Sequence, residues 1–203
     1  MIRLHILYIS QHFPPETGAA QGRAYEMAKN LVELGNEVTV ITGFPNYGKG
    51  EVYEGYKGKL FQKETVDGIN VIRTFLVPDT KSNVVVRLLN YISFFLSSIL
   101  GGLVVRDVNK VYATSPQLLV GLSGYLLSLR HSSEFVLEIR DLWIDFAINL
   151  EQITNKLIIK LARVLEKFLY KVSDKLVVVT NGFKEKISEQ GIIRDQISVA
   201  TNG

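Results

Sequence analysis

The chain has 203 residues, of which 47% are hydrophobic and 21% are charged, and its formal net charge is +3. A chain of this length and balance can form one domain with a substantial core, so extended disorder is excluded over most of it. The sequence has no cysteine, which excludes disulfides, thiol catalysis and cysteine-based zinc sites.

Strand and helix patterns alternate along the chain. Apolar segments typical of buried strands are residues 3–10, 37–43, 110–115, 134–140, 174–180 and 196–201. Two more strands, 60–66 and 69–77, flank Asp67-Gly68, a dipeptide that favours a hairpin turn. Helical patterns cover residues 19–34, 83–105, 116–129, 141–172 and a short segment that ends at 190. This order predicts a doubly wound α/β domain with a mainly parallel sheet, helices on both faces and one inserted β-hairpin.

The segment 88–105 contains no charged residue and is as long as a membrane span. It also contains Asn90, three serines and the pair Gly101-Gly102, and arginines bracket it closely. We therefore favour a buried helix, or one lying on a bilayer surface, over a true span.

Polar residues with special backbone requirements follow the predicted strands. In open α/β sheets, ligands bind outside the carboxyl ends of the strands, so these residues are the candidates for a site. They are His12, Glu16 and Gly18 after the first strand, Asn46 and Tyr47 after the second, then Ser115, and then Arg140, Asp141 and Trp143.

The first connection, residues 10–23, is suited to anion binding. Gly18 lies where the first helix begins, and free N–H groups at a helix N-terminus favour phosphate; alternatively, Gly18 serves only a turn. Arg23 could reach an anion or pair with Glu26 or another acid. The connection lacks G-x-G-x-x-G, and no acidic residue ends the second strand, so a dinucleotide enzyme is disfavoured. A P-loop is also absent from the sequence.

Asp141 is the best single candidate for catalysis, because a carboxylate at a strand's carboxyl end can accept a proton from an attacking hydroxyl. The alternatives are an ion pair with Arg140 or a helix cap. His12 is a second candidate base or phosphate partner. Glu138 lies inside a strand and is expected to pair with a Lys or Arg of another element. The spacing of His, Asp and Glu indicates no metal site.

Basic residues recur along the segment 156–171 every three or four positions, which places them in a stripe of about 80° on a helix. This basic stripe comprises Lys156, Lys160, Arg163, Lys167 and Lys171. It indicates either a solvated helix face or contact with an anionic membrane surface. Nucleic acid is disfavoured, because the stripe lacks interleaved aromatic residues.

The motifs "FPPETGA" (13–19), "TGFPNY" (42–47) and "RDLW" (140–143) occur in an order that resembles the family-four, group-one retaining glycosyltransferases. The resemblance covers essentially the whole chain and is closest to the branch that builds bacterial surface polysaccharides, including fucosamine-transferase-like enzymes. It implies a GT-B architecture, in which two Rossmann-like domains face each other across a cleft. Residues 1–203 would be the N-terminal, acceptor-side domain, and the C-terminal donor domain would lie outside this chain. The ending "TNG" agrees with that expectation.

The resemblance also assigns roles to residues. Gly18 and Ala19 would offer backbone N–H groups to the donor diphosphate, whereas Arg140 and Asp141 would lie at the acceptor side. The loop with Asn46 and Tyr47 would shape the acceptor pocket. Transfer would proceed with retention, without a metal or cofactor, and the nucleotide-diphosphate sugar would be a substrate. One departure is Ile144-Asp145, where the family often has a proline followed by an acid.

We therefore expect the acceptor-binding half of a glycosyltransferase, inactive on its own, which acts with a nucleotide sugar and a lipid-linked or surface-glycan acceptor. The expected location is the cytoplasm, peripheral to the inner face of the cell membrane. Two alternatives stay open at this point: a sugar-nucleotide epimerase of the same architecture, and a non-catalytic membrane-surface module that pairs with a separate donor domain.

Overall fold

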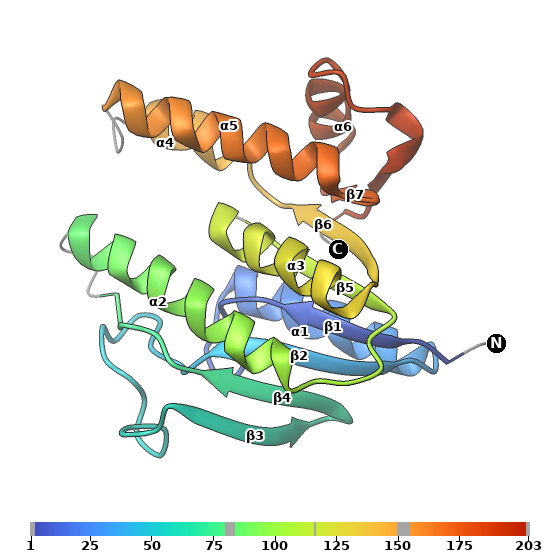
Figure 1. Ribbon diagram of the computed structural model, residues 1–203. Helices are drawn as coiled ribbons and strands as arrows, with labels where there is room; N and C mark the ends of the chain where they lie inside the picture. The colour runs from blue at the N-terminus through green and yellow to red at the C-terminus, as the bar shows by residue number, and fades with distance from the viewer. Residues whose placement is uncertain (1–2, 80–83, 116, 150–154, 202–203) are drawn as a thin grey trace.

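The computed structural model describes residues 3–79, 84–115, 117–149 and 155–201, and Figure 1 shows the arrangement of its elements. The strands are β1 (His5–Ile9), β2 (Glu37–Gly43), β3 (Phe61–Val66), β4 (Ile69–Thr74), β5 (Lys110–Thr114), β6 (Glu134–Ile139), β7 (Lys175–Val178) and β8 (Ile197–Val199). The helices are α1 (Ala19–Glu33), α2 (Val84–Leu103), α3 (Leu118–His131), α4 (Trp143–Asn149), α5 (Lys156–Val172), α6 (Asn181–Ser188) and the 3₁₀ turn η1 (Arg194–Gln196). The predicted helix start at Pro116 lies outside the described residues.

The strands form one eight-stranded sheet in the order β3-β4-β2-β1-β5-β6-β7-β8. Every neighbouring pair is parallel except β3 with β4. From β1 the chain builds one side of the sheet with β2, β3 and β4 and then restarts at β5 on the other side of β1, so the order reverses between β1 and β5. The predicted doubly wound α/β class is confirmed.

The two faces of the sheet carry separate parts of the core. Helix α1 covers one face of the sheet, where Tyr8, Val40 and Val71 are among the buried side chains. Helices α2, α3, α5 and α6 cover the other face, where Leu7, Phe94 and Leu127 are among the buried side chains. In Figure 1, α2, α3 and α5 lie side by side in front of the sheet, and α1 lies behind it.

Local turn chemistry places two of the connections. Asp67 and Gly68 have φ values of 48° and 80°, the left-handed pair that a type I′ hairpin turn requires. Gly35, with φ 88°, ends α1: its N–H donates to the Val32 carbonyl and the Asn36 N–H donates to Leu31. This is the Schellman pattern, in which glycine adopts the left-handed conformation at low cost. The predicted hairpin and the predicted end of the first helix are both confirmed.

One predicted helix is divided. The expected helix across 141–172 is observed as α4 and α5, with residues 150–154 outside the described part. The side chain of Asn155 accepts hydrogen bonds from the N–H groups of Leu157 and Ile158 at 2.9 and 3.3 Å. Because this is an N-cap, α5 begins as a separate helix rather than continuing α4.

Helix α2 packs on the sheet with its small and polar residues. Asn90 and Ser98 are almost fully buried, and the Ser93 and Ser97 hydroxyls bond to backbone groups of Val77 and Phe75. A Cβ on Gly101 would lie 2.7 Å from a Thr74 side-chain carbon, so glycine permits close approach to β4. Helix α2 is long and apolar enough to cross a membrane by length and composition, but in this fold it contacts β2, β4 and α3.

Candidate functional site

The candidate site lies at the carboxyl edge of the sheet, around the ends of β1 and β5. These strands pair in parallel with Ile9 opposite Ala113, and the strand order reverses between them. Connections that leave such a point in opposite directions open a crevice, which is where open α/β sheets bind ligands. The loops after β1, β2, β5 and β6 carry the residues that the sequence selected.

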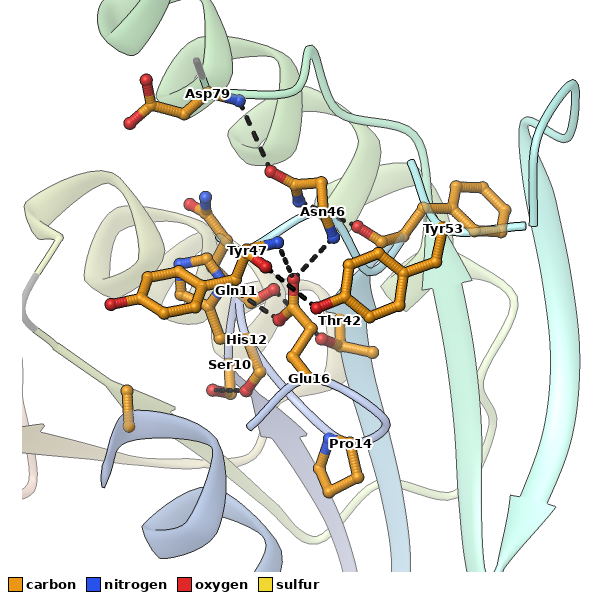
Figure 2. Close-up of polar contacts among 12 residues, drawn as sticks. Ser10, Gln11, His12, Pro14, Glu16, Thr42, Asn46, Tyr47, Tyr53 and Asp79 are labelled. Atoms are coloured by element: carbon orange, nitrogen blue, oxygen red, sulfur yellow. Dashed lines mark hydrogen bonds and ion pairs between the residues drawn. The ribbon is translucent and has the colours of Figure 1, made fainter. Parts of the chain in front are cut away.

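Glu16 joins the loops after β1 and β2 (Figure 2). One carboxylate oxygen accepts hydrogen bonds from the backbone N–H groups of Asn46 and Tyr47, both at 2.7 Å. The other oxygen lies 3.1 Å from Nδ1 of His12. The residue is only 4% exposed, so this charge is held inside the protein by partners on both oxygens.

The surroundings of Glu16 favour its ionised form. Burial acts to raise the pKa of the carboxyl, but the hydrogen bond and charge of His12 and the two backbone N–H donors outweigh it. The pKa is therefore lowered from the ordinary value. An ionised, fully bonded glutamate holds two loops together and is poorly placed to take up a proton from a substrate.

The predicted acceptor residues near this cluster differ in accessibility. Asn46 is buried; its amide donates to the Phe44 carbonyl at 2.9 Å and accepts from the Asp79 N–H at 3.4 Å. Tyr47 is exposed, and the half-buried His12 ring meets its edge at 5.4 Å between centroids. Asn46 and Glu16 thus shape the loop from inside, and Tyr47 and His12 present the outer surface.

The N-terminus of α1 is open. Gly18 precedes the helix with φ 151°, no side chain of the described residues caps it, and the first turn contains no acidic residue. The dihedral angle favours glycine, and a Cβ on Gly18 would lie 2.7 Å from Oε1 of Gln21, so the amide of Gln21 would have to shift. Exposed Gly18 and Ala19 leave first-turn N–H groups directed outward, the arrangement that receives an anion.

Arg23 is bound by partners within the protein, and it also lines a cavity together with Ala19 of the first turn. Its Nε and one terminal nitrogen donate to Oε1 of Glu138 at 2.9 and 2.6 Å, and it also bonds the carbonyls of Ala200 and Thr201. The guanidinium is 11% exposed and Glu138 is fully buried. The ion-pair alternative is thus observed, with a buried acid on β6 rather than Glu26, and the diphosphate role stays a prediction. The expected basic partner for Glu138 is confirmed.

Arg140 joins three of the predicted segments. Its backbone N–H donates to Oγ of Ser115 at 2.9 Å, and its guanidinium donates to the Ala20 carbonyl in the first turn of α1 at 3.3 Å. Beside this contact lies a cavity of about 640 Å³ that includes Ala19, Arg140 and Thr201 in its lining. The segments after β5 and β6 therefore meet the open end of α1 directly.

Asp141 is exposed, and among the described residues its carboxylate has neither a hydrogen-bond donor nor an ion-pair partner. The predicted pair with Arg140 is therefore not formed in this part of the chain. With Ser115 and Trp143, Asp141 lines a small cavity of about 20 Å³, the size of a single water. This is the one candidate carboxylate at the described edge that is free to meet a substrate hydroxyl.

Sequence reasoning missed a buried aromatic pair beneath the site. Tyr8 of β1 and Tyr112 of β5 stack with centroids 5.0 Å apart, which follows from their pairing in register. Burial and the nearby charge of Glu138 raise the pKa of both phenols, so they stay neutral. Tyrosines at matching inward positions of two adjacent strands were the signal available in the sequence.

The basic stripe of α5 is divided by the fold. Arg163 bonds Asp145 and also lies 3.1 Å from Glu166, whereas Lys156, Lys160, Lys167 and Lys171 are exposed. Burial acts to raise the pKa of Asp145, but the hydrogen bonds from Lys186 and Arg163 lower it on balance. Arg163 thus holds α4 against α5 through Asp145, and the membrane contact of the stripe stays a prediction.

Within the described ranges, His, Asp and Glu side chains form no group of three that could hold a metal ion. Oxygen donors at the edge are either bonded internally, as in Glu16, or single, as in Asp141.

A match in sequence shows the family to which this chain belongs. Residues 18–203 match the family described as "Glycosyl transferase 4-like domain". The chain belongs to this family. The matched region begins at Gly18, the residue that opens α1, and includes the segments that carry Ser115, Arg140 and Asp141. No curated protein matches the glycosyltransferase domain in sequence.

Solved structures agree on the fold. The crystal structure of CalG4, the calicheamicin glycosyltransferase, superposes with a TM-score of 0.59 at 12% identity, covering 99% of this chain and 53% of that one. The glycosyltransferase domain therefore spans about half the length of that structure, consistent with half of a GT-B fold. At such low identity the likeness concerns the fold alone.

Proposed function

We propose that the domain is the acceptor-side half of a retaining, metal-independent glycosyltransferase. It would move a sugar from a nucleotide-diphosphate sugar to a lipid-linked or surface-glycan acceptor. The observation that carries this proposal is the contact between Arg140 and the Ala20 carbonyl. It places the segment bearing the free carboxylate of Asp141 next to the open N-terminus of α1.

In this proposal the donor diphosphate binds at the first turn of α1. Gly18 and Ala19 supply backbone N–H groups, and the helix dipole adds to the attraction. Because Arg23 is bound to Glu138, the cationic contribution at this end comes from Arg140 instead. Donor specificity for one sugar belongs to the second domain, which we propose follows this one in the full-length chain.

The acceptor would approach from the side of Asp141. Its carboxylate accepts the proton of the attacking hydroxyl as the acceptor oxygen bonds the anomeric carbon on the face from which the nucleoside diphosphate leaves with the electron pair of the broken C–O bond. Attack from that face retains the anomeric configuration. Ser115 holds the backbone of Arg140 in place. Trp143 follows Asp141 by two residues and is partly accessible, and exposed Tyr47 and half-buried His12 lie on the loops after β2 and β1 at the same edge of the sheet. Flat rings of this kind suit the faces of sugars. Glu16 and Asn46 support the loop that presents Tyr47.

We further propose that the protein acts in the cytoplasm, peripheral to the inner face of a bacterial cell membrane, in surface-polysaccharide synthesis close to the fucosamine-transferase-like branch. Nucleic acid is not among the proposed partners. The motif resemblance supports this placement. Membership of the family alone specifies neither the donor sugar nor the acceptor.

The test is a transfer assay with the full-length protein. Labelled nucleotide sugars are incubated with membranes that contain lipid-linked glycans, and we expect label to enter the solvent-extractable lipid. Interconversion of the free sugar nucleotide without acceptor would instead identify an epimerase. A full-length chain that turns over neither substrate would indicate a non-catalytic module.

Two further readouts address the finer parts of the proposal. The anomeric configuration of the product, determined by NMR, should equal that of the donor. Chelation of divalent cations should leave the transfer rate unchanged. Inversion would overturn retention, and a rate restored only by added magnesium or manganese would overturn metal independence.

A further inference from the structure

Helix α2 is oriented opposite to an ordinary surface helix. Its inward face carries Asn90, Ser98 and Gly101 around Phe94, and only 28% of the window Val85–Leu103 is buried. Its outward face carries the large apolar residues: Val85, Leu88, Leu89, Ile92, Leu96, Leu100 and Leu103. A helix in contact with water normally buries its leucines and exposes its serines, so this outward face is built for a non-aqueous surface.

Inward polar residues of α2 have a definite function in the fold. Asn90 accepts a hydrogen bond from Gln11 at 2.6 Å and donates to the Val77 carbonyl at 2.6 Å. Ser93 and Ser97 bond the chain that follows β4. The helix therefore cannot turn its leucines inward without leaving these buried groups unpaired.

Helix α5 shows a second exposed apolar row. Leu157, Leu161, Val164 and Phe168 are 64%, 61%, 60% and 39% exposed, and they follow one another at helical spacing. At about 100° per residue, this row lies directly beside the exposed lysines of the basic stripe. Those lysines are Lys156, Lys160, Lys167 and Lys171.

The two apolar rows belong to one layer. Helix α3 contacts both α2 and α5, and Figure 1 shows the three helices side by side on the same face of the sheet. Exposed Leu126 and Leu129 of α3 add to this surface. At its edge, an apolar groove of about 620 Å³ lies between α2 and the hairpin and is lined by Phe61, Phe75, Leu96 and Leu100, among others.

Charge selects the occupant. The three helices contain one acidic residue, Glu166, which is buried and paired with Arg163. The exposed charges on α5 are all positive. Leucines beside lysines, with no exposed acid on these helices, match the interface of an anionic bilayer, into which apolar residues insert while lysines remain at the phosphate level.

We propose that the outer surface of α2, α3 and α5, here called the helical docking face, binds the surface of an anionic lipid bilayer. Leu100 and its neighbours on α2 enter the acyl boundary, and the four lysines of α5 contact lipid phosphates. Helix α2 lies along the membrane rather than across it, because its inward side is bonded to the sheet. This inference rests on the proposed membrane location and does not require the transfer reaction.

Vesicle flotation tests the proposal with the full-length protein. We expect the protein to float with vesicles of phosphatidylcholine and phosphatidylglycerol and to bind vesicles of phosphatidylcholine alone at least about tenfold more weakly. Leu100→Glu should reduce the partition coefficient by about tenfold or more, because one exposed leucine no longer inserts. Lys160→Glu with Lys167→Glu should reduce it by more than about tenfold on anionic vesicles only.

Matched variants on the opposite side of the sheet serve as controls. Leu34, at the end of α1, is 63% exposed, compared with 67% for Leu100, so Leu34→Glu makes the same change outside the helical docking face. Lys29→Glu is the control for the lysines, compared with Lys160→Glu alone so that the change in net charge is equal. Both controls should float like the parent protein.

Three outcomes would overturn the proposal. One is a parent protein that stays at the bottom of the gradient with anionic vesicles. Another is an equal loss in the α1 controls, and the third is a Leu100→Glu protein that floats unchanged while light scattering shows a dimer becoming a monomer. The last result would identify the face as an interface between two copies. None of these results depends on sugar transfer, so the proposed transfer reaction is tested separately from the proposed membrane location.

Discussion

Glu16 and Asp141 are carboxylates at the same edge of the sheet, but they differ in burial and in hydrogen-bond partners. Glu16 is 4% exposed and has partners on both oxygens. Asp141 is exposed and has no such partner among the described residues. A carboxylate that is already saturated with donors contributes to stability, whereas one without donors is free to exchange a proton with a ligand.

The same division applies to the cations. Arg23 donates hydrogen bonds to Glu138 and to two carbonyls. Arg140 donates from one terminal nitrogen to the Ala20 carbonyl, and its buried Nε has no acceptor among the described residues. Partner counting at this edge therefore separates groups that build the site from groups that can act in it. Three experiments test this separation, and a fourth compares two glycines at the open end of α1.

The largest expected effect is on turnover. Asp141→Asn removes the proposed proton acceptor, and transfer by the full-length enzyme should fall by about a hundredfold or more. Its free energy of unfolding should change by less than about 0.5 kcal/mol, because no partner is lost. Urea unfolding and the labelled-sugar assay provide the two values.

Asp195→Asn, an exposed aspartate on η1, is the matched control and should affect neither value. A stable Asp141→Asn enzyme with normal turnover would show that Asp141 takes no part in sugar transfer.

Glu16→Ala should have the opposite profile. The N–H groups of Asn46 and Tyr47 would lose their acceptor inside the protein, and each unsatisfied buried donor costs about 1–3 kcal/mol. We expect the free energy of unfolding to fall by about 3 kcal/mol in urea titrations. Glu33→Ala, at the exposed end of α1, should change it by less than about 0.5 kcal/mol. A Glu16→Ala loss no greater than that would mean that the cluster is not a brace.

The sequence predicted the class of fold because its signals are local. Alternating apolar segments located the strands, and Asp67-Gly68 specified the hairpin through two left-handed residues. The order of elements then limited the topology to a doubly wound sheet. The division of 141–172 was missed, because the cap that starts α5 is a single residue, Asn155, within an otherwise helical pattern.

The roles of site residues depended on contacts that no local pattern contains. Arg23 and Glu138 are 115 positions apart, and Glu16 bonds backbone groups about 30 positions away. Helix α2 illustrates the same limit: its periodicity separates serines from leucines correctly but does not say which side faces the sheet. Backbone groups of Phe75 and Val77, which follow β4, decide that, because they form hydrogen bonds with Ser97 and Ser93 on the inward side of α2.

The pH dependence of stability tests the charge on Glu16. Because the folded pKa is lowered, the ionised form is stabilised by folding. That contribution is fully present above the unfolded pKa of about 4.3 and is lost as the pH falls through the folded pKa. The parent's free energy of unfolding should therefore fall more steeply below about pH 4.3 than that of Glu16→Gln. Parallel curves would show that the Glu16 charge contributes nothing to stability.

The smallest expected effects distinguish two glycines of the same helix end. Gly18 has φ 151°, and its Cβ would lie 2.7 Å from the amide oxygen of Gln21, whereas Gly22 has no heavy atom within 4 Å of the position of its Cβ. Gly18→Ala should lower the free energy of unfolding by about 1–2 kcal/mol, and Gly22→Ala should raise it by about 0.5–1 kcal/mol.

Calorimetry with a nucleoside diphosphate adds the functional half of this comparison. If the first turn of α1 receives the diphosphate, Gly18→Ala should also weaken binding, because the added methyl group displaces the oxygens from the N–H groups. Gly22→Ala, which lies past the first turn, should bind as the parent does. Equal binding by the parent, Gly18→Ala and Gly22→Ala would show that α1 does not receive the diphosphate. Gly18 would then be a turn residue with a structural role only, as Glu16 has in the same loop.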